Sequence, residues 1–293
     1  MIAAVGVIAV VVKIKEDSDM KIIKISVALM LLFLITSDAR GYFMENKVKS
    51  DTYSVNSLDH TGKVLEVRIP SGNIIIERNG ALNVDYYFEY NADNATPAVA
   101  NEIFGKCKIK FRNNVLTAEY PELQSGWLNA HYNMTVPQDV SLKIYLGAGK
   151  VSVMGIGLAD VAVEVDSGKI TFDNVQIAGA ARLLLSSGNI RVANSKVGGD
   201  GLLSVGSGKI TLQRPEFKKD SSVIVQKGKI HYQYDPGNTG KISYVGNSDR
   251  KSRVNFNAGK SCTLNGNTLV CAEQLPEIKV DVKKGRLEIL PTD

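Results

Sequence analysis

The sequence is poor in the residue types that build most catalytic and metal centres. Its 293 residues include only three histidines, three cysteines and one tryptophan. The three histidines, His60, His131 and His231, have no metal-ligand spacing with cysteines or carboxylates, so we expect scattered surface histidines. A nucleophile elbow is missing, and GAGKVSVMG lacks both the GK[ST] ending and the following helix of a phosphate-binding loop. We therefore expect no cofactor, no metal and no enzymatic activity.

A strong charge of one sign is missing as well. The chain has 35 basic and 30 acidic residues, which leaves a net charge of +5. This mild excess suits an anionic partner but lacks the dense Lys/Arg clustering of a dedicated nucleic-acid binder. We expect no nucleic-acid partner.

No apolar run near the beginning of the chain is long enough for a membrane-spanning helix. Residues 2–12 and 25–36 are apolar, whereas a span needs about 18 to 20 residues. From Met20, MKIIK is basic, ISVALMLLFLIT is apolar, and SDA is a cleavage signal ending at Ala39. We predict an export leader over residues 1–39 with cleavage after Ala39, and no membrane span in the mature chain. An uncleaved anchor, and Met1 rather than Met20 as the true start, stay open.

Two of the cysteines flank a predicted β-hairpin. The segment CTLNGNTLVC carries a Gly266-Asn267 pair suited to a type II′ turn. That turn makes Cys262 and Cys271 a non-hydrogen-bonded pair with Cα atoms about 4.5 Å apart, a separation that a disulfide tolerates. We predict a disulfide in an oxidising compartment, with a reduced pair as the alternative. Cys107 alternates with apolar residues and is expected to be a buried thiol.

Glycines recur with a period of about 20 residues. Gly149 is followed after 19 residues by Gly168, and Gly188, Gly208 and Gly228 then come at intervals of 20. Two residues after each glycine the chain is always apolar, at Val151, Ile170, Ile190, Ile210 and Ile230. Further apolar columns stand three and five residues before each glycine, and four after it. Columns of one character at a fixed period predict stacked coils with a shared core.

The glycine in each unit lies between two short apolar stretches of strand periodicity. A glycine tolerates positive φ at a tight corner, so we interpret each one as a corner of a coil. VRIPSGNIII and VDVKKGRLEI have the same pattern around Gly72 and Gly285 and are expected to be the first and last coils. We predict one domain over residues 40–293, with regular coils over about 140–234 and antiparallel β insertions over about 80–138 and 235–276.

The run VPQDVSLKIYLGAGKVSV, followed by VEVDSGKITF, SSGNIRV and GSGKITL, resembles the bacterial putative-adhesin β-strand-repeat family. The likeness spans about residues 60–290. It implies an all-β, right-handed β-solenoid, an exported or envelope setting, and no established activity. The family has no agreed binding residues to transfer.

One outward column suggests a surface property. Directly after the corner glycines stand Lys150, Lys169, Lys209 and Lys229, with Asn189 in the middle. Stacked about 4.8 Å apart, they would form a basic ridge able to bind spaced anionic groups. The alternative is a solvated corner where lysines discourage edge pairing. Glu164 and Asp166 lie on one coil, but neighbouring coils supply no partner carboxylates in the same columns, which argues against a glycosidase pair.

These observations favour a non-enzymatic exported protein of the periplasm or cell surface, or a secreted one. We expect an adhesin-like module whose partner is unknown, with an anionic envelope polymer, a glycan and a protein as candidates. The second hypothesis is an envelope-stress or scaffold protein that self-assembles through its coil ends. The third is a polysaccharide-processing β-helix enzyme.

Overall fold

The computed structural model describes residues 46–55, 64–93, 95–237, 239–245, 252–258, 262–265, 267–271 and 276–292. The export leader predicted over residues 1–39, its start and its cleavage site, and His60 lie outside these residues. Among the described residues, no helix is both long enough and apolar enough to cross a membrane.

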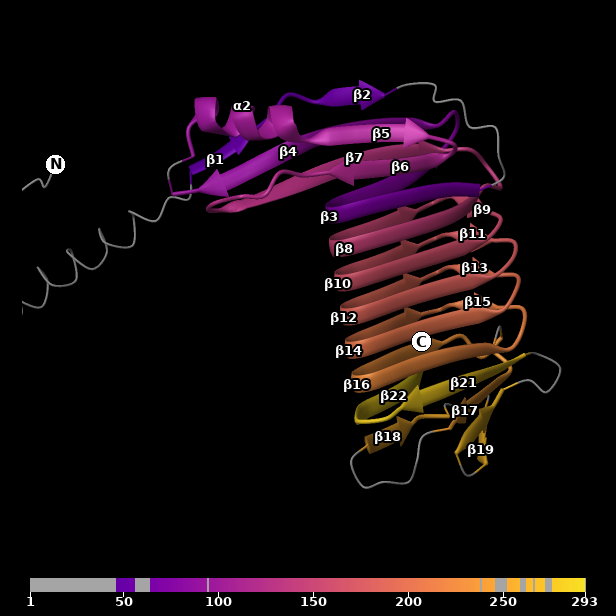
Figure 1. Cartoon of the computed structure of the whole chain (residues 1–293). Coiled ribbons are helices and arrows are strands. Elements are labelled where there is room, and N and C mark those ends of the chain that lie inside the picture. Colours follow the sequence, from indigo (N-terminus) through magenta and orange to yellow (C-terminus); the bar gives the residue numbers. More distant parts are fainter. Residues whose placement is uncertain are drawn as a thin grey trace, which may run out of the picture. The chain divides into compact units, whose positions relative to one another are not determined.

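The regular part of the molecule is a stack of five long parallel strands (Figure 1). They are β8 (Ser141–Met154), β10 (Val161–Asp173), β12 (Ala181–Ala193), β14 (Gly201–Gln213) and β16 (Ser221–Tyr234). Each corner glycine faces the next one, so that the strands pair with a shift of one repeat and no slip. The predicted β-solenoid with coils of about 20 residues is confirmed.

A short strand closes the third side of each of the four coils that begin with β8, β10, β12 and β14. Strands β9 (Gly157–Leu158), β11 (Gln176–Ile177), β13 (Lys196–Val197) and β15 (Glu216–Phe217) form a separate parallel sheet. Their apolar residues Leu158, Ile177, Val197 and Phe217 are at most 4% exposed. The inward side chains of all three sides therefore fill one continuous core, and each contributes roughly 1.5 to 3 kcal/mol when fully buried.

The corner glycines bend the long strands without interrupting their pairing. Gly168, Gly188, Gly208 and Gly228 have φ between +133° and +145°, which side chains disfavour. The stacking adds a second reason, because a Cβ at Gly188 would lie 1.9 Å from the carbonyl oxygen of Gly168. Glycine is therefore required here both by the backbone conformation and by the close approach of successive coils.

The two outer coils also have the predicted register. Strand β3 (Val64–Asn79) pairs with β8 and places Gly72 opposite Gly149. At the other end, β21 (Glu277–Val282) and β22 (Gly285–Pro291) pair with β16 and place Gly285 opposite Gly228. The last coil is thus added after a long excursion of the chain, as the pattern around Gly285 predicts.

The segment between β3 and β8 forms the N-terminal cap. Strands β6 (Val115–Glu119) and β7 (Trp127–Val136) lie parallel to β3, so they add a broken coil to the stack rather than a purely antiparallel insertion. Antiparallel strands follow: β4 (Asn83–Ala92) on β7, β5 (Lys108–Arg112) on β6, and β1 (Asn46–Lys49) and β2 (Tyr53–Val55) on β4.

A helix in this cap departs from the all-β expectation. Helix α2 (Pro97–Lys106) begins after Thr96, whose hydroxyl accepts a hydrogen bond from the Val99 amide, and proline stands in its first turn. It buries Ala100 and Phe104, and the Phe104 ring stacks on Phe88 with centroids 6.1 Å apart. The Thr-Pro start is a local helix signal that the strand periodicity around it obscured.

The C-terminal cap also adds a broken coil of parallel strands to the stack, built from different elements. Strands β17 (Lys241–Tyr244) and β18 (Ser252–Phe256) lie parallel to β21 and β22 as a second broken coil. The hairpin of β19 (Thr263–Asn265) and β20 (Thr268–Val270) pairs through β20 with β17. Both ends of the stack are therefore covered by strands outside the regular repeat.

Candidate anion-binding column

The lysines predicted to form a ridge lie in one straight column. Pairing of the long strands places Lys150 opposite Lys169, Lys169 opposite Asn189, Asn189 opposite Lys209, and Lys209 opposite Lys229. We call these five residues the basic column. All five are exposed, because the next residue in each strand, such as Ile170, points into the core. Neighbouring members are about 4.8 Å apart along the stack.

The four lysines of the basic column have no ion-pair partner among the residues that the structure describes. Lysines elsewhere on the coils differ. Lys196 lies 3.3 Å from Glu216, and Lys218 contacts the same carboxylate. Four like charges on one edge repel one another, so an external anion that bridges them would be favoured.

Asn189 divides the basic column into two pairs. Lys150 and Lys169 form one pair, and Lys209 and Lys229 form the other. Two strand spacings, about 10 Å, separate Lys169 from Lys209. The column therefore suits a ligand with several anionic groups along its length better than a single small anion.

Two arginines follow the column at its C-terminal end, and the charge of the first, Arg286, is compensated. Lys229 faces Arg286, which faces Arg253 of β18. Arg286 Nη2 lies 3.4 Å from Glu288 Oε1, and the other oxygen of Glu288 lies 3.1 Å from His231 Nδ1. The four lysines, and Arg253 beyond Arg286, therefore carry positive charge without an ion-pair partner among the described residues.

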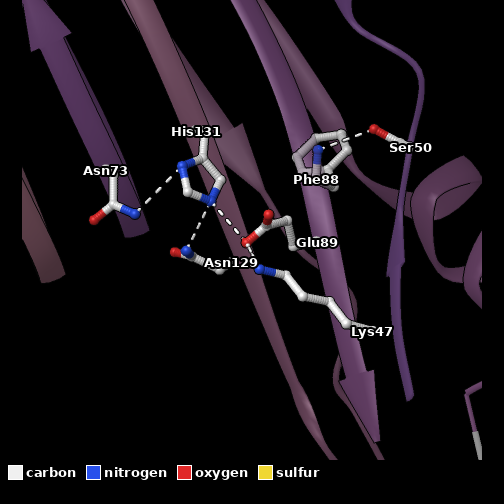
Figure 2. Close-up of polar contacts among 7 residues, drawn as sticks. All are labelled: Lys47, Ser50, Asn73, Phe88, Glu89, Asn129 and His131. Carbon is white, nitrogen blue, oxygen red and sulfur yellow. Dashed lines mark hydrogen bonds and ion pairs between the residues drawn. The ribbon is translucent and has the colours of Figure 1, made fainter. Parts of the chain in front are cut away.

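At its N-terminal end the column leads to a polar network around His131. Asn73 faces Lys150 on one side and His131 on the other. Figure 2 shows His131 between Asn73, Asn129 and Glu89, with Nε2 3.0 Å from Glu89 Oε2 and 2.9 Å from Asn129 Nδ2. Its Nδ1 lies 3.4 Å from Asn73 Nδ2. A hydrogen on Nε2, donated to Glu89, leaves Nδ1 free to accept from Asn73, and in this tautomer Nε2 makes no hydrogen bond with the Asn129 NH2 group, which is also a donor.

The charges of this network are used within it. Lys47 Nζ lies 2.8 Å from Glu89 Oε2 (Figure 2). Partial burial opposes ionisation, but hydrogen bonds from Lys47 and His131 outweigh it and hold the pKa of Glu89 below its usual value. Lys49 lies 3.7 Å from the centre of the Tyr87 ring, which stacks on His131 at 4.4 Å. The basic column therefore ends at this network, because Lys47 and Lys49 interact with residues inside it.

Hydrogen bonds between β4 and Ser50, the residue that follows β1, support this network. The Ser50 hydroxyl accepts a hydrogen bond from the Phe88 amide at 2.9 Å (Figure 2), and the Ser50 amide donates to the Phe88 carbonyl, also at 2.9 Å. Sequence reasoning treated His131 as a scattered surface histidine and missed its partners. The alternation of β7 places His131 on the outer face, but only the pairing of β4 with β7 brings Glu89 next to it.

The cysteines lie at the two caps. The structure joins Cys262 and Cys271 through a disulfide with Cα atoms 4.2 Å apart, at the open end of the β19–β20 hairpin. Leu264 faces Leu269 there, in the predicted register, whereas Gly266 of the predicted turn lies outside the described residues. Formation of this bond in the cell stays a prediction. Cys107 is half-buried beside helix α2, and burial raises the pKa of its thiol to about 11, which makes it a poor nucleophile.

Three comparisons relate the chain to known proteins. The model of the family described as Toastrack DUF4097 matches residues 65–256. No match was found among the curated proteins. Among solved structures, a putative adhesin from Parabacteroides distasonis has 11% identity and a TM-score of 0.44, covering 85% of this chain and 96% of that chain.

Two further solved structures are similar. A putative cell adhesion protein from Clostridium sporogenes has 14% identity and a TM-score of 0.36, with 84% of this chain and 100% of that chain covered. A putative lipid binding protein from Parabacteroides distasonis has 11% identity and a TM-score of 0.33, with 85% and 98% covered.

Proposed function

The chain belongs to the Toastrack DUF4097 family, and from this premise we propose that it is a non-enzymatic, exported interaction module that binds a linear anionic polymer of the cell envelope through its basic column. The observation that carries the proposal is the in-register stacking of Lys150, Lys169, Lys209 and Lys229, exposed and without ion-pair partners in the described part of the chain.

The geometry supports a polymer rather than a small anion. The column crosses five successive strands, so only a ligand with repeated anionic groups can contact both lysine pairs at once. Multiple weak contacts on one chain combine into a useful affinity. Self-assembly through coil ends receives less support, because strands of the caps cover the end coils: β6 and β7 on β3, and β17 and β18 on β21 and β22.

The test compares two triple variants of equal charge. Lys169→Gln, Lys209→Gln and Lys229→Gln remove most of the basic column, whereas Lys143→Gln, Lys219→Gln and Lys279→Gln remove three exposed lysines outside it. Binding of the protein, expressed from the full sequence, is measured against linear polyphosphate and polygalacturonate at several salt concentrations. The column variant is expected to bind at least about tenfold more weakly and with a shallower salt dependence.

Equal losses in the two variants would show that only net charge matters and would refute the proposal. Vesicles of phosphatidylglycerol and of phosphatidylcholine form a further arm. Binding confined to the anionic vesicles, without binding to either polymer, would replace the polymer by a lipid surface.

A further inference from the structure

A second candidate site lies on the part of the long strands that precedes the corner glycines. The basic column, in contrast, consists of the residues directly after these glycines. It is a cleft of about 550 Å³ where β6 ends beside β3, β8 and β10. Its outward lining includes Arg68, Thr117, Glu119, Tyr145, Glu164 and Asp166. The volume is within the range of small-molecule sites, about 300 to 1,000 Å³.

At the cleft, the backbones of β3 and β8 pack closely together. Gly147 lies beside Pro70, and a Cβ on Gly147 would be 2.4 Å from the Pro70 carbonyl oxygen. The end of β6 is held nearby by Tyr120, whose hydroxyl donates a hydrogen bond to the Ser71 carbonyl at 2.8 Å. The cleft therefore lies at the junction of the N-terminal cap with the regular coils.

One wall of the cleft is an aromatic ring in a fixed position. Tyr145 faces Arg68 on β3 and Glu164 on β10. Tyr145 is 36% exposed, and the Arg68 guanidinium lies 5.2 Å from the centre of its ring. Glu66 contacts Arg68 and holds it there. The regular coils have Leu184 and Ser204 in the column of Tyr145, so this ring is specific to the cleft.

The other lining groups are hydrogen-bond acceptors. Glu119 lies 2.7 Å from Lys110, and Glu164 lies 4.0 Å from Arg182. Asp166 is exposed and has no hydrogen-bond or ion-pair partner within the described residues. Glu119, Glu164 and Arg68 each have a partner of opposite charge, so Asp166 is the lining charge without one among the described residues, and the cleft offers little attraction to the anionic polymers expected on the basic column.

From this combination we infer that the cleft binds a neutral oligosaccharide. The exposed face of Tyr145 can pack against the C–H face of a sugar ring, as aromatic rings pack against apolar surfaces. Asp166 can accept hydrogen bonds from neighbouring sugar hydroxyls, and Arg68 has further N–H donors for sugar oxygens. A few convergent polar groups around an apolar contact are what a small-ligand site requires. The inference is independent of the basic column.

The experiment uses neutral tetrasaccharides of glucose, mannose, galactose and N-acetylglucosamine as probes, with binding followed by calorimetry and ligand-observed NMR. At least one is expected to show saturable binding. Tyr145→Ala should weaken it about tenfold, and Asp166→Asn severalfold. The matched controls, Trp127→Ala at another exposed aromatic residue and Asp200→Asn at another exposed carboxylate, should leave it unchanged.

Absence of saturable binding to all four probes would overturn the inference, as would equal effects of Tyr145→Ala and Trp127→Ala. The triple lysine variant of the basic column should bind the tetrasaccharide normally, so failure of either site is recognised separately. Shortening of a bound tetrasaccharide would support the cleft and would refute the non-enzymatic part of the proposed function.

Discussion

The regular coils from β8 to β16 and the two ends of the stack bury the same kind of apolar column in different ways. Within the regular coils, Ile190 is covered by Ile170 and Ile210, its own equivalents one repeat before and after. At the ends one of these neighbours is replaced by strands outside the repeat, β6 and β7 on β3, and β17 and β18 on β21 and β22. Identical coils can extend the core by stacking, but the last coil at each end must be covered by residues that differ from the repeat.

The difference also separates the two candidate sites. The basic column needs only the repeat, because each coil contributes one residue at the same position. The cleft needs the cap, because Thr117 and Glu119 come from β6, outside the repeat. We therefore expect regular coils to supply extended surfaces and the cap junction to supply a concave one.

The largest effect should come from a charge in the shared core. Ile190 is fully buried, and Ile190→Asp places an unpaired carboxylate between two coils. We expect a loss of at least about 4 kcal/mol and of cooperative unfolding in thermal melting followed by circular dichroism. Asn189→Asp adds the same charge at the exposed neighbouring position and should melt like the original protein. A cooperative, unshifted transition for Ile190→Asp would contradict the register.

A medium effect, confined to one end, should follow removal of the disulfide. Replacing Cys262 and Cys271 by serine opens a closed loop of about ten residues, which costs about 2 to 3 kcal/mol in the chain-entropy description. Hydrogen exchange should accelerate in β17 to β20 and stay unchanged in β10 to β14. Cys107→Ala, which removes a cysteine without removing a crosslink, is the control. Uniform acceleration along the whole stack would show that cap and coils unfold together.

The smallest effect should come from the polar network of the N-terminal cap. The pKa of Glu89 is lower in the folded protein than its usual value of 4.5, so its stabilising contribution is present above about pH 4.5 and is lost as the pH falls further. Because the ion pairs of Glu89 with Lys47 and His131 are near the surface, we expect them to contribute less than about 1 kcal/mol to the free energy of unfolding.

The measurement is urea unfolding between pH 3 and pH 7. Glu89→Gln should reduce stability at pH 7 and flatten its decline below pH 4.5, whereas Glu122→Gln, at an exposed residue outside the network, should leave both unchanged. An unchanged pH profile for Glu89→Gln would remove the network as a source of stability for the edge strand β1.

Much of the fold could be predicted because the same pattern of glycine and apolar residues recurs in every coil. The glycine columns and the apolar residues beside them predict both the register of β8 to β16 and the outer coils at Gly72 and Gly285. Helix α2 and the parallel pairing of β6 and β7 with β3 occur once, so no second copy of the pattern reveals them.

The sequence by itself determined the stacked coils, their corner glycines and the alignment of the basic column, because each depends on residues at a constant separation along the chain. Only the tertiary structure decided the His131 network and the cleft beside Tyr145. Glu89 and His131 are 42 residues apart, and Glu119 reaches the cleft through the path of the cap. Such contacts are set by how irregular strands pack at the end of the stack, which no local pattern encodes.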